Sequence, residues 1–159
     1  AMFGGLMAAI FTAAVLAQAT PNFAGTWTLV PDANAPAGGR GGRSGMTGFG
    51  QQATVTQDAK ALTVVRTTQA GEVKSTYNLD GSKSTNTLTF GVNSIEQVSV
   101  AKWDGPRLVI TTSSNFQGNA FETSMRVWLE GGNLVLETTR PDFQGGGAPI
   151  TTRQTYKKS

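Results

Sequence analysis

The segment Ala120-Phe-Glu-Thr-Ser-Met-Arg-Val-Trp-Leu129 decides the fold class. Its odd-numbered positions from 121 onward are mostly apolar, and its even-numbered positions carry mainly charged or hydroxyl side chains. A period of two places one face of a β-strand against a core and the other face in water. Trp128 falls on the wet face, where we expect it to be exposed. The segment is therefore predicted to be a half-buried strand.

Similar short stretches flank this segment on both sides, separated by turn residues such as Glu130-Gly131-Gly132-Asn133 and Asp80-Gly81-Ser82. An Asp-Gly step between two strands is a hairpin signal. The predicted strands are 22–30, 53–57, 61–68, 73–79, 84–90, 94–103, 107–114, 120–129, 133–139 and 149–156. This spacing is typical of all-β sandwiches and barrels, and we expect an antiparallel up-and-down barrel of about eight to ten strands.

Alternation along these strands also assigns a set of side chains to the barrel interior. The expected inward set is Val55, Leu62, Val64, Tyr77, Leu79, Leu88, Phe90, Val98, Val100, Leu108, Ile110, Phe121, Met125, Leu129, Leu136 and Tyr156. A barrel of this size either encloses one small ligand or is filled by its own side chains. The sequence leaves both alternatives open.

Composition excludes several classes of function. The 159 residues carry a net charge of only +3, which gives no nucleic-acid footprint, and they include neither cysteine nor histidine. A thiol nucleophile and a Ser-His-Asp triad are therefore absent. Most acidic residues fall in predicted turns, where they commonly bind backbone amides. We expect no catalytic site, no metal site and no cofactor, and hence no enzyme.

The start of the chain is apolar, with no charged residue before Asp32. The run ends in Ala17-Gln18-Ala19, a small-x-small pattern typical of signal-peptide cleavage sites. We expect residues 1–20 to be retained as a transmembrane anchor helix, which leaves residues 21–159 on the periplasmic side of a bacterial inner membrane. The alternative is a leader on a soluble protein. The side chains expected to contact lipid are Met2, Phe3, Leu6, Met7, Ile10, Phe11, Val15 and Leu16.

Residues 31–50 interrupt the strand pattern. They are too rich in glycine for a helix, and a loop of this length is typically either mobile or docked on a partner. Exposed aromatic side chains often anchor protein interfaces. The aromatic residues expected to be exposed for partner contacts are Phe49, Phe116, Trp128 and Phe143.

Phe23-Ala-Gly25-Thr26-Trp27-Thr-Leu-Val30 resembles the opening strand of the calycin superfamily, with the Gly-x-Trp of lipocalins and the Phe-x-Gly-Thr-Trp-x-Leu of fatty-acid-binding proteins. Lys102-Trp103-Asp104-Gly105, residues 129–134 and the pair Arg153 and Tyr156 follow in that family's order. The resemblance covers residues 22–158 outside the Gly-rich loop. It implies an antiparallel barrel in which Trp27 plugs one end.

The chain departs from fatty-acid-binding proteins in two places. Those proteins insert two lid helices between their first two strands, where this chain has the Gly-rich loop. Their last strand carries Arg-x-Tyr facing a carboxylate, but here the spacing is Arg153-Gln-Thr-Tyr156. Side chains alternate along a strand, so these two residues face opposite ways unless a bulge intervenes. They remain the candidate polar contacts for a ligand.

Two hypotheses of function follow. The first is a non-catalytic accessory subunit of a bacterial membrane complex, bound to other membrane-protein subunits and to membrane lipid. In this respect the chain resembles the small accessory subunits of photosynthetic reaction-centre and light-harvesting assemblies. The alternative is a periplasmic lipocalin-like binder that holds a lipid, a carotenoid or another apolar small molecule in the barrel.

Overall fold

The computed structural model describes residues 20–31, 48–68 and 71–159, without the side chain of Phe90. Nearly all of the expected anchor helix, residues 1–20, and most of the Gly-rich segment 31–50 lie outside these residues. Within the described ranges, no helix has the length and apolar character needed to cross a membrane.

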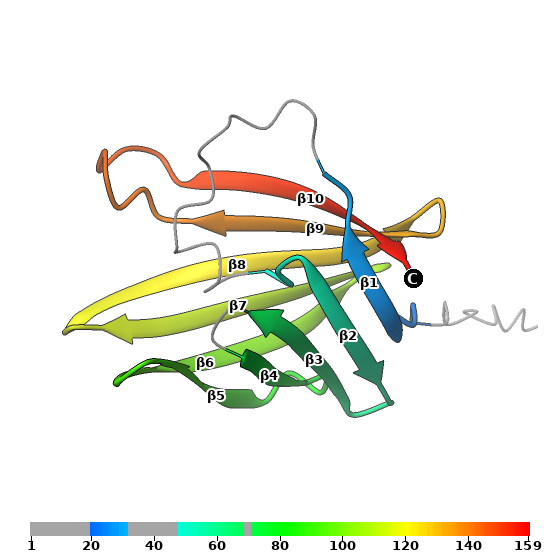
Figure 1. The fold of residues 1–159 in the computed structure, drawn as a ribbon, viewed down its shortest axis with the longest axis horizontal. Helices are drawn as coiled ribbons and strands as arrows, with labels where there is room; N and C mark the ends of the chain where they lie inside the picture. Colours follow the sequence, from blue (N-terminus) through cyan, green and yellow to red (C-terminus); the bar gives the residue numbers. More distant parts are fainter. Residues whose placement is uncertain (1–19, 32–47, 69–70) are drawn as a thin grey trace, which may run out of the picture.

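Ten strands form the structure, in the places where the sequence predicts them (Figure 1). They are β1 (Gly25–Leu29), β2 (Gln52–Gln57), β3 (Ala61–Thr68), β4 (Gly71–Asn78), β5 (Lys83–Phe90), β6 (Asn93–Asp104), β7 (Arg107–Phe116), β8 (Asn119–Glu130), β9 (Asn133–Arg140) and β10 (Ile150–Lys158). The prediction of an all-β antiparallel fold with about ten strands is confirmed.

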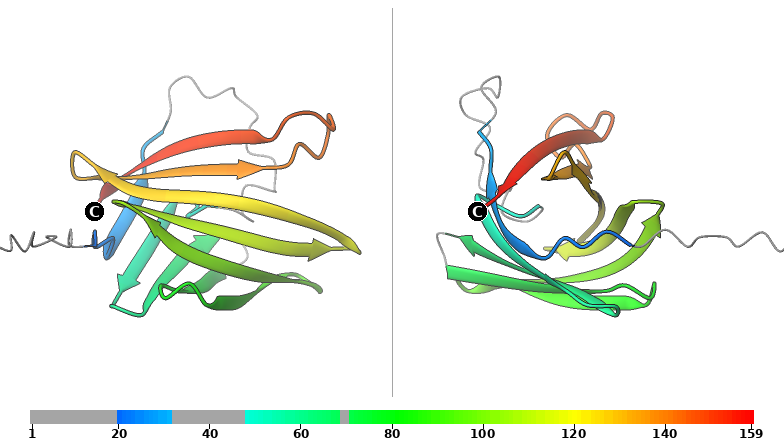
Figure 2. Two further views of the ribbon diagram at one scale, coloured as in Figure 1. Left: turned by 180° about the vertical axis from the view of Figure 1, so that it is seen from behind. Right: turned by 90° about the vertical axis from the view of Figure 1, so that its right-hand side faces the viewer.

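The strands form one sheet in the order β4-β3-β2-β1-β10-β9-β8-β7-β6-β5. Each strand pairs with its neighbour along the chain, except at the step from β4 to β5, and β1 also pairs with β10. The sheet curves around a common interior, as the end-on view in Figure 2 shows. The edge strands β4 and β5 thereby approach each other, and the result is a nearly closed barrel.

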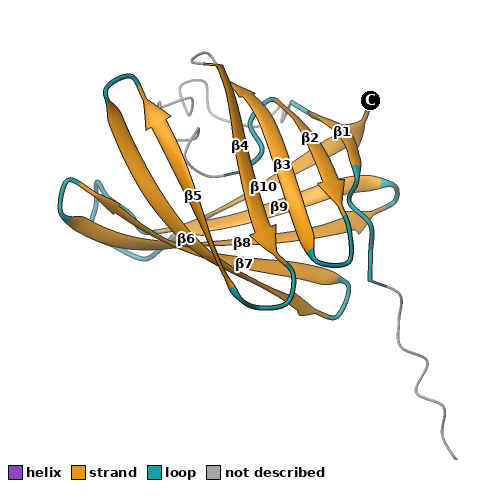
Figure 3. Ribbon diagram, turned by 90° about the horizontal axis from the view of Figure 1, so that it is seen from below, coloured by secondary structure: helices purple, strands orange, loops and turns teal. Residues whose placement is uncertain are grey.

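The hairpin predicted at Asp80-Gly81 is wrong. The chain does turn there, with Gly81 at a φ of +83°, but β4 and β5 lie at opposite edges of the sheet and share no backbone ladder. Figure 3 shows the two strands diverging from the loop that joins them. The prediction failed because side chains, rather than backbone groups, close the barrel at this point.

Asn86 bridges this seam by imitating a backbone partner. Its side-chain Oδ1 accepts a hydrogen bond from the Thr76 amide at 2.8 Å, and its Nδ2 donates to the Thr76 carbonyl oxygen at 3.0 Å. Next to it, the Ser84 hydroxyl accepts a hydrogen bond from the Asn78 amide at 2.7 Å. These contacts satisfy backbone groups on β4 that an exposed sheet edge would leave unpaired.

Most of the expected inward set is buried, but β6 presents its other face. Ile95 and Ala101 are buried, whereas Val98 and Val100 are only partly covered. The prediction failed because Val98 and Val100 share their parity with Glu96 and Lys102. Turning that face inward would bury two charges, and the free-energy cost of burying them is larger than the free energy gained by burying two valines.

Two residues of β8 assigned to the interior also lie differently. Leu129 stands at the end of the strand and is 40% exposed. Phe121 is half-buried, and its ring contacts Phe143 in the loop before β10, with ring centroids 5.2 Å apart. Both residues keep the expected parity, but the strand extends beyond the buried part of the barrel.

Aromatic side chains fill the barrel end near the turn between β6 and β7. Phe23 stacks on Trp103 with ring centroids 5.8 Å apart, and Trp27 is buried in the same cluster. The Trp27 indole N–H donates to the Phe23 carbonyl oxygen at 2.8 Å. The Gln57 side chain holds this segment, since it accepts from the Phe23 amide and donates to the Pro21 carbonyl oxygen. Trp27 thus has the packing role that the resemblance implies.

The seam contacts make a testable prediction about stability. N86A removes both hydrogen bonds to Thr76 and leaves two backbone groups without their partner, so the free energy of unfolding should fall by about 1–3 kcal/mol. T85A, at an exposed position on the same strand, is the matched control and should change the free energy of unfolding by a few tenths of a kcal/mol at most. Urea unfolding followed by circular dichroism measures both. Equal losses in the two variants would contradict the bridging role of Asn86.

Candidate functional site

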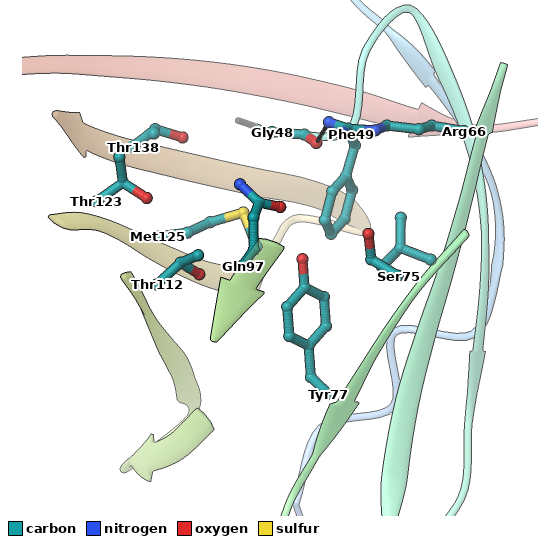
Figure 4. A pocket seen from close by; sticks show the side chains of 11 residues that line it. Gly48, Phe49, Arg66, Ser75, Tyr77, Gln97, Thr112, Thr123, Met125 and Thr138 are labelled. Carbon is teal, nitrogen blue, oxygen red and sulfur yellow. Dashed lines mark hydrogen bonds between the residues drawn. The ribbon is translucent and has the colours of Figure 1, made fainter. Parts of the chain in front are cut away.

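The barrel interior contains a small cavity with a mixed polar and apolar lining. Its free volume is about 30 Å³, roughly the space of one water molecule. Figure 4 shows its lining side chains, which come from strands β3, β4 and β6 to β9 and from the segment before β2. The lining residues are Gly48, Phe49, Val64, Arg66, Ser75, Tyr77, Gln97, Thr112, Thr123, Met125 and Thr138.

Arg66 is the charged side chain of this lining, and it is only 5% exposed. It lies on β3 in the same inward register as Leu62 and Val64, both buried. Its Nη1 donates to the Gly48 carbonyl oxygen at 2.8 Å, whereas its buried Nε has no hydrogen-bond partner. Burial lowers the pKa of the Arg66 guanidinium, and the neighbouring tyrosines oppose that effect. An arginine still keeps its charge in proteins.

No carboxylate compensates this buried charge within the described part of the chain. The two ion pairs there, Arg126 with Glu137 and Arg153 with Glu130, involve side chains that are at least partly exposed. A buried cation without an anionic partner is costly in free energy. The interior therefore has unused capacity to bind a hydrogen-bond acceptor, above all an anionic one.

The two tyrosines of the chain also point toward this region. The Tyr156 hydroxyl donates to the Gly50 carbonyl oxygen at 2.9 Å. Burial raises the pKa of Tyr156 to about 12, although a hydrogen bond with the backbone at Phe49 opposes the shift. Burial likewise raises the pKa of Tyr77, against the effect of the Arg66 charge. Both phenols are therefore neutral donors near neutral pH.

Phe49 is not an exposed contact residue, and this part of the sequence interpretation is wrong. Its side chain is 1% exposed and packs against Tyr156, with ring centroids 6.0 Å apart. Gly48 and Gly50 on either side adopt positive φ angles of +88° and +68°, which glycine tolerates best. These two glycines direct the ring into the barrel, and an aromatic residue in a Gly-rich stretch has no periodic pattern that would reveal this.

Trp128 is also buried rather than exposed, with 8% of its surface accessible. It lies on the outer face of β8, as the alternation predicts, but two arginines cover it. The guanidinium carbons of Arg107 and Arg153 lie 4.7 Å and 5.3 Å from the centroid of its ring. The Trp128 indole N–H donates to Glu130, which also pairs with Arg153 at 2.8 Å. This cluster gives Trp128 a packing role on the outer surface.

The remaining sequence candidates divide between the two faces of the sheet. Arg153 points outward and Tyr156 inward, so the structure does not bring this pair together. Phe116 is half-buried at the end of β7, and Phe143 is 46% exposed. Partner contacts by these two phenylalanines stay predictions.

Three turn carboxylates bind backbone amides, as expected from their positions. Asp58 accepts hydrogen bonds from the amides of residues 60 and 61, Asp80 from that of residue 82, and Asp142 from those of residues 144 and 145. These bonds lower the pKa of Asp58 and Asp142, and the Ser82 side chain and amide together lower that of Asp80. All three carboxylates serve local turns and lie outside the cavity lining.

Sequence reasoning overlooked Arg66, although a signal was present. The strand 61–68 places Leu62 and Val64 inward, and the next residue of that parity is Arg66. A charge at the third inward position of an apolar strand is unusual and indicates either a buried ion pair or a ligand site. The strand pattern could therefore have identified this residue, but not its partners from other strands and from residues 48–50.

Comparison with solved structures places this barrel among known folds. The crystal structure of apo Caenorhabditis elegans lipid binding protein 8 matches with a TM-score of 0.56 and 13% sequence identity, over 86% of this chain and 95% of that one. The two chains share a fold. No protein-family model and no curated protein matches the sequence, so the likeness concerns the fold alone.

The buried phenols make a prediction for alkaline pH. Because the folded-state pKa of Tyr156 lies above its ordinary value of 10.0, the neutral phenol stabilises the fold fully below pH 10. This stabilisation should be lost as the pH rises toward about 12. Thermal unfolding should therefore show a falling midpoint over this range, with a smaller slope in Y156F. Tyrosinate absorbance near pH 10 should be lower in the native protein than in urea. Equal absorbance in the two states would contradict the burial of both phenols.

Proposed function

We propose that this protein binds a small, mainly apolar molecule, such as a lipid, inside its barrel, and that it does so without catalysing a reaction. The observation that carries the proposal is Arg66, a buried guanidinium that faces an interior cavity and has no carboxylate partner among the described residues. The lipid-binding protein that shares the fold supports the same interpretation.

Arg66 is hard to explain as a purely structural residue. Apolar side chains of similar volume commonly replace buried charges without loss of stability, and often with a gain. Val64 on the same strand and Met125 on β8 contribute apolar surface to the same lining. A charge retained there is better explained by an acceptor group that arrives with a ligand and forms charge-assisted hydrogen bonds.

The lining combines some apolar surface with a larger number of polar groups, which suits the polar end of an amphiphile. Met125, Val64 and Phe49 offer apolar surface, while hydroxyl and amide groups from β4 and from β6 to β9 offer donors and acceptors. Sites for small molecules typically combine a mostly apolar lining with a few placed polar groups, so this lining is more polar than is usual and fits the polar end of a ligand. Lipid and carotenoid are the ligand classes that the sequence suggests, and the buried cation favours a molecule with an acceptor at one end.

The accessory-subunit hypothesis stays a prediction, because its main support is the apolar run of residues 1–20 in the sequence. Membrane attachment, periplasmic placement and a photosynthetic partner depend on that run and not on the barrel. Mild-detergent purification of the full chain should yield stoichiometric partner subunits if this hypothesis holds. A ligand-carrying barrel that purifies without partners favours binding as the main function.

The first experiment tests whether the full chain carries a ligand. Organic extraction of the purified protein followed by mass spectrometry should recover one apolar molecule in about equimolar amount. Ligand-free protein prepared by delipidation should then bind a fluorescent fatty-acid analogue with saturation at a single site. Absence of both the extracted molecule and saturable binding would contradict the proposed function.

A second prediction assigns the site to Arg66. R66M should weaken binding of the fluorescent analogue about tenfold to a hundredfold, the equivalent of a charge-assisted hydrogen bond worth about 1.5–3 kcal/mol. R153M removes an arginine on the outer face and serves as the matched control, with affinity unchanged. Equal affinities in R66M and R153M would place the ligand elsewhere. Circular dichroism should show both variants folded.

A further inference from the structure

Gly48 and Phe49 differ from the rest of the cavity lining in one respect. The other lining residues belong to strands whose backbones are held by antiparallel ladders, whereas these two belong to the connection before β2. The cavity free volume of about 30 Å³ is far too small for a lipid, since ligand pockets commonly measure about 300–1,000 Å³. A ligand therefore has to displace part of the lining, and this connection is the part without a ladder.

The Gly48–Gly50 segment is held inside the barrel by the two polar groups that a ligand would use. Arg66 donates to the Gly48 carbonyl oxygen at 2.8 Å, and Tyr156 donates to the Gly50 carbonyl oxygen at 2.9 Å. The Phe49 ring between them is buried against Tyr156. The segment therefore places an acceptor oxygen on the Arg66 guanidinium and an apolar group in the core. A bound amphiphile with an acidic end is expected to have the same arrangement.

We propose that the Gly48–Gly50 segment is a resident occupant of the binding site, and that an amphiphile with one acidic end group displaces it. The acidic group takes the place of the Gly48 carbonyl oxygen on Arg66, and the nearest part of the apolar chain takes the space of the Phe49 ring. This inference rests on the proposed function and adds to it the class of ligand and the competing element. No covalent step is involved.

The backbone geometry of the Gly48–Gly50 segment favours its exchange for a ligand. Gly48 and Gly50 hold positive φ angles, so two residues without side chains carry the turn that inserts the ring. The following residue is fixed, because the Leu29 amide donates to the Gln51 carbonyl oxygen at 2.9 Å. Displacement therefore begins on the N-terminal side of Gln51 and leaves the β1–β2 ladder intact. An anion on Arg66 also compensates the charge better than a carbonyl oxygen does.

The absence of cysteine in these 159 residues permits a direct test in this chain. F49C introduces a single thiol at the buried position, and its rate of reaction with a maleimide reports whether the segment is inside the barrel. Saturation with sodium oleate should raise this rate about tenfold or more, since protection depends on the closed population. L134C, buried on β9, should stay protected, and F143C, at an exposed position, should react rapidly with and without oleate.

The outcomes separate this inference from the proposed function. In the first outcome, oleate displaces the fluorescent analogue from a sample in which the thiol at position 49 stays protected. This result overturns the proposed displacement of the Gly48–Gly50 segment and leaves the proposed function standing. Failure of both the wild type and F49C to bind oleate or the analogue overturns the proposed function together with this inference. Binding with exposure of the thiol supports both.

A second variant tests the competition without changing a lining side chain. G50A disfavours the inserted conformation, because a φ of +68° is strained for alanine. The apparent affinity for oleate should rise about fivefold to tenfold as the open population grows. G105A carries a similar strain, at a φ of +58° in the β6–β7 turn, and should leave the affinity unchanged. Oleyl alcohol, which lacks the acid, should bind at least about tenfold more weakly than oleate. Equal affinity for the acid and the alcohol, or no difference between G50A and G105A, would overturn the proposal.

Discussion

A guanidinium enclosed by a curved sheet must find its hydrogen-bond acceptors inside the barrel, and this constraint organises the interior of the protein. The Arg66 side chain points into the barrel because it lies on the same face of β3 as Leu62 and Val64. Its own strand β3 is paired on both sides, with β2 and with β4, so the backbone carbonyl oxygens of that strand are used in ladders. The acceptor that reaches it therefore comes from Gly48 in a connecting segment, and the inward path of Phe49 follows from that bond.

The two ends of the barrel differ in how they are closed. Near the β6–β7 turn, Phe23 and Trp103 stack and Gln57 binds the backbone on both sides of Asn22, so aromatic packing and hydrogen bonds act together. Among the described residues, the Gly48–Gly50 segment is held instead by hydrogen bonds from two side chains and by the packing of one ring. Local opening occurs where few apolar contacts and few backbone bonds hold a segment. Within the described residues, the Gly48–Gly50 segment is thus the less firmly held of these two closures.

Period-two alternation predicted the strands well, because it reflects a local choice between water and core at every second residue. It failed where both parities carried apolar side chains, as in β6, since the choice there depends on the charges of Glu96 and Lys102. It also failed for Phe49 and for the β4–β5 seam. Those features depend on contacts between residues far apart in the sequence, such as Arg66 with Gly48 and Asn86 with Thr76. No window of neighbouring residues contains that information.

The sequence left open whether the barrel is hollow or filled, and in the structure the interior around Arg66 is largely filled. Strand side chains leave a polar space around Arg66, and a connecting segment occupies it with one ring and one carbonyl oxygen. A barrel filled in this way needs no empty cavity to be a binding protein. Under the proposed displacement, the free energy of ligand binding is the difference between two occupants of one site, so affinity depends on how well the segment fits as well as on how well the ligand does.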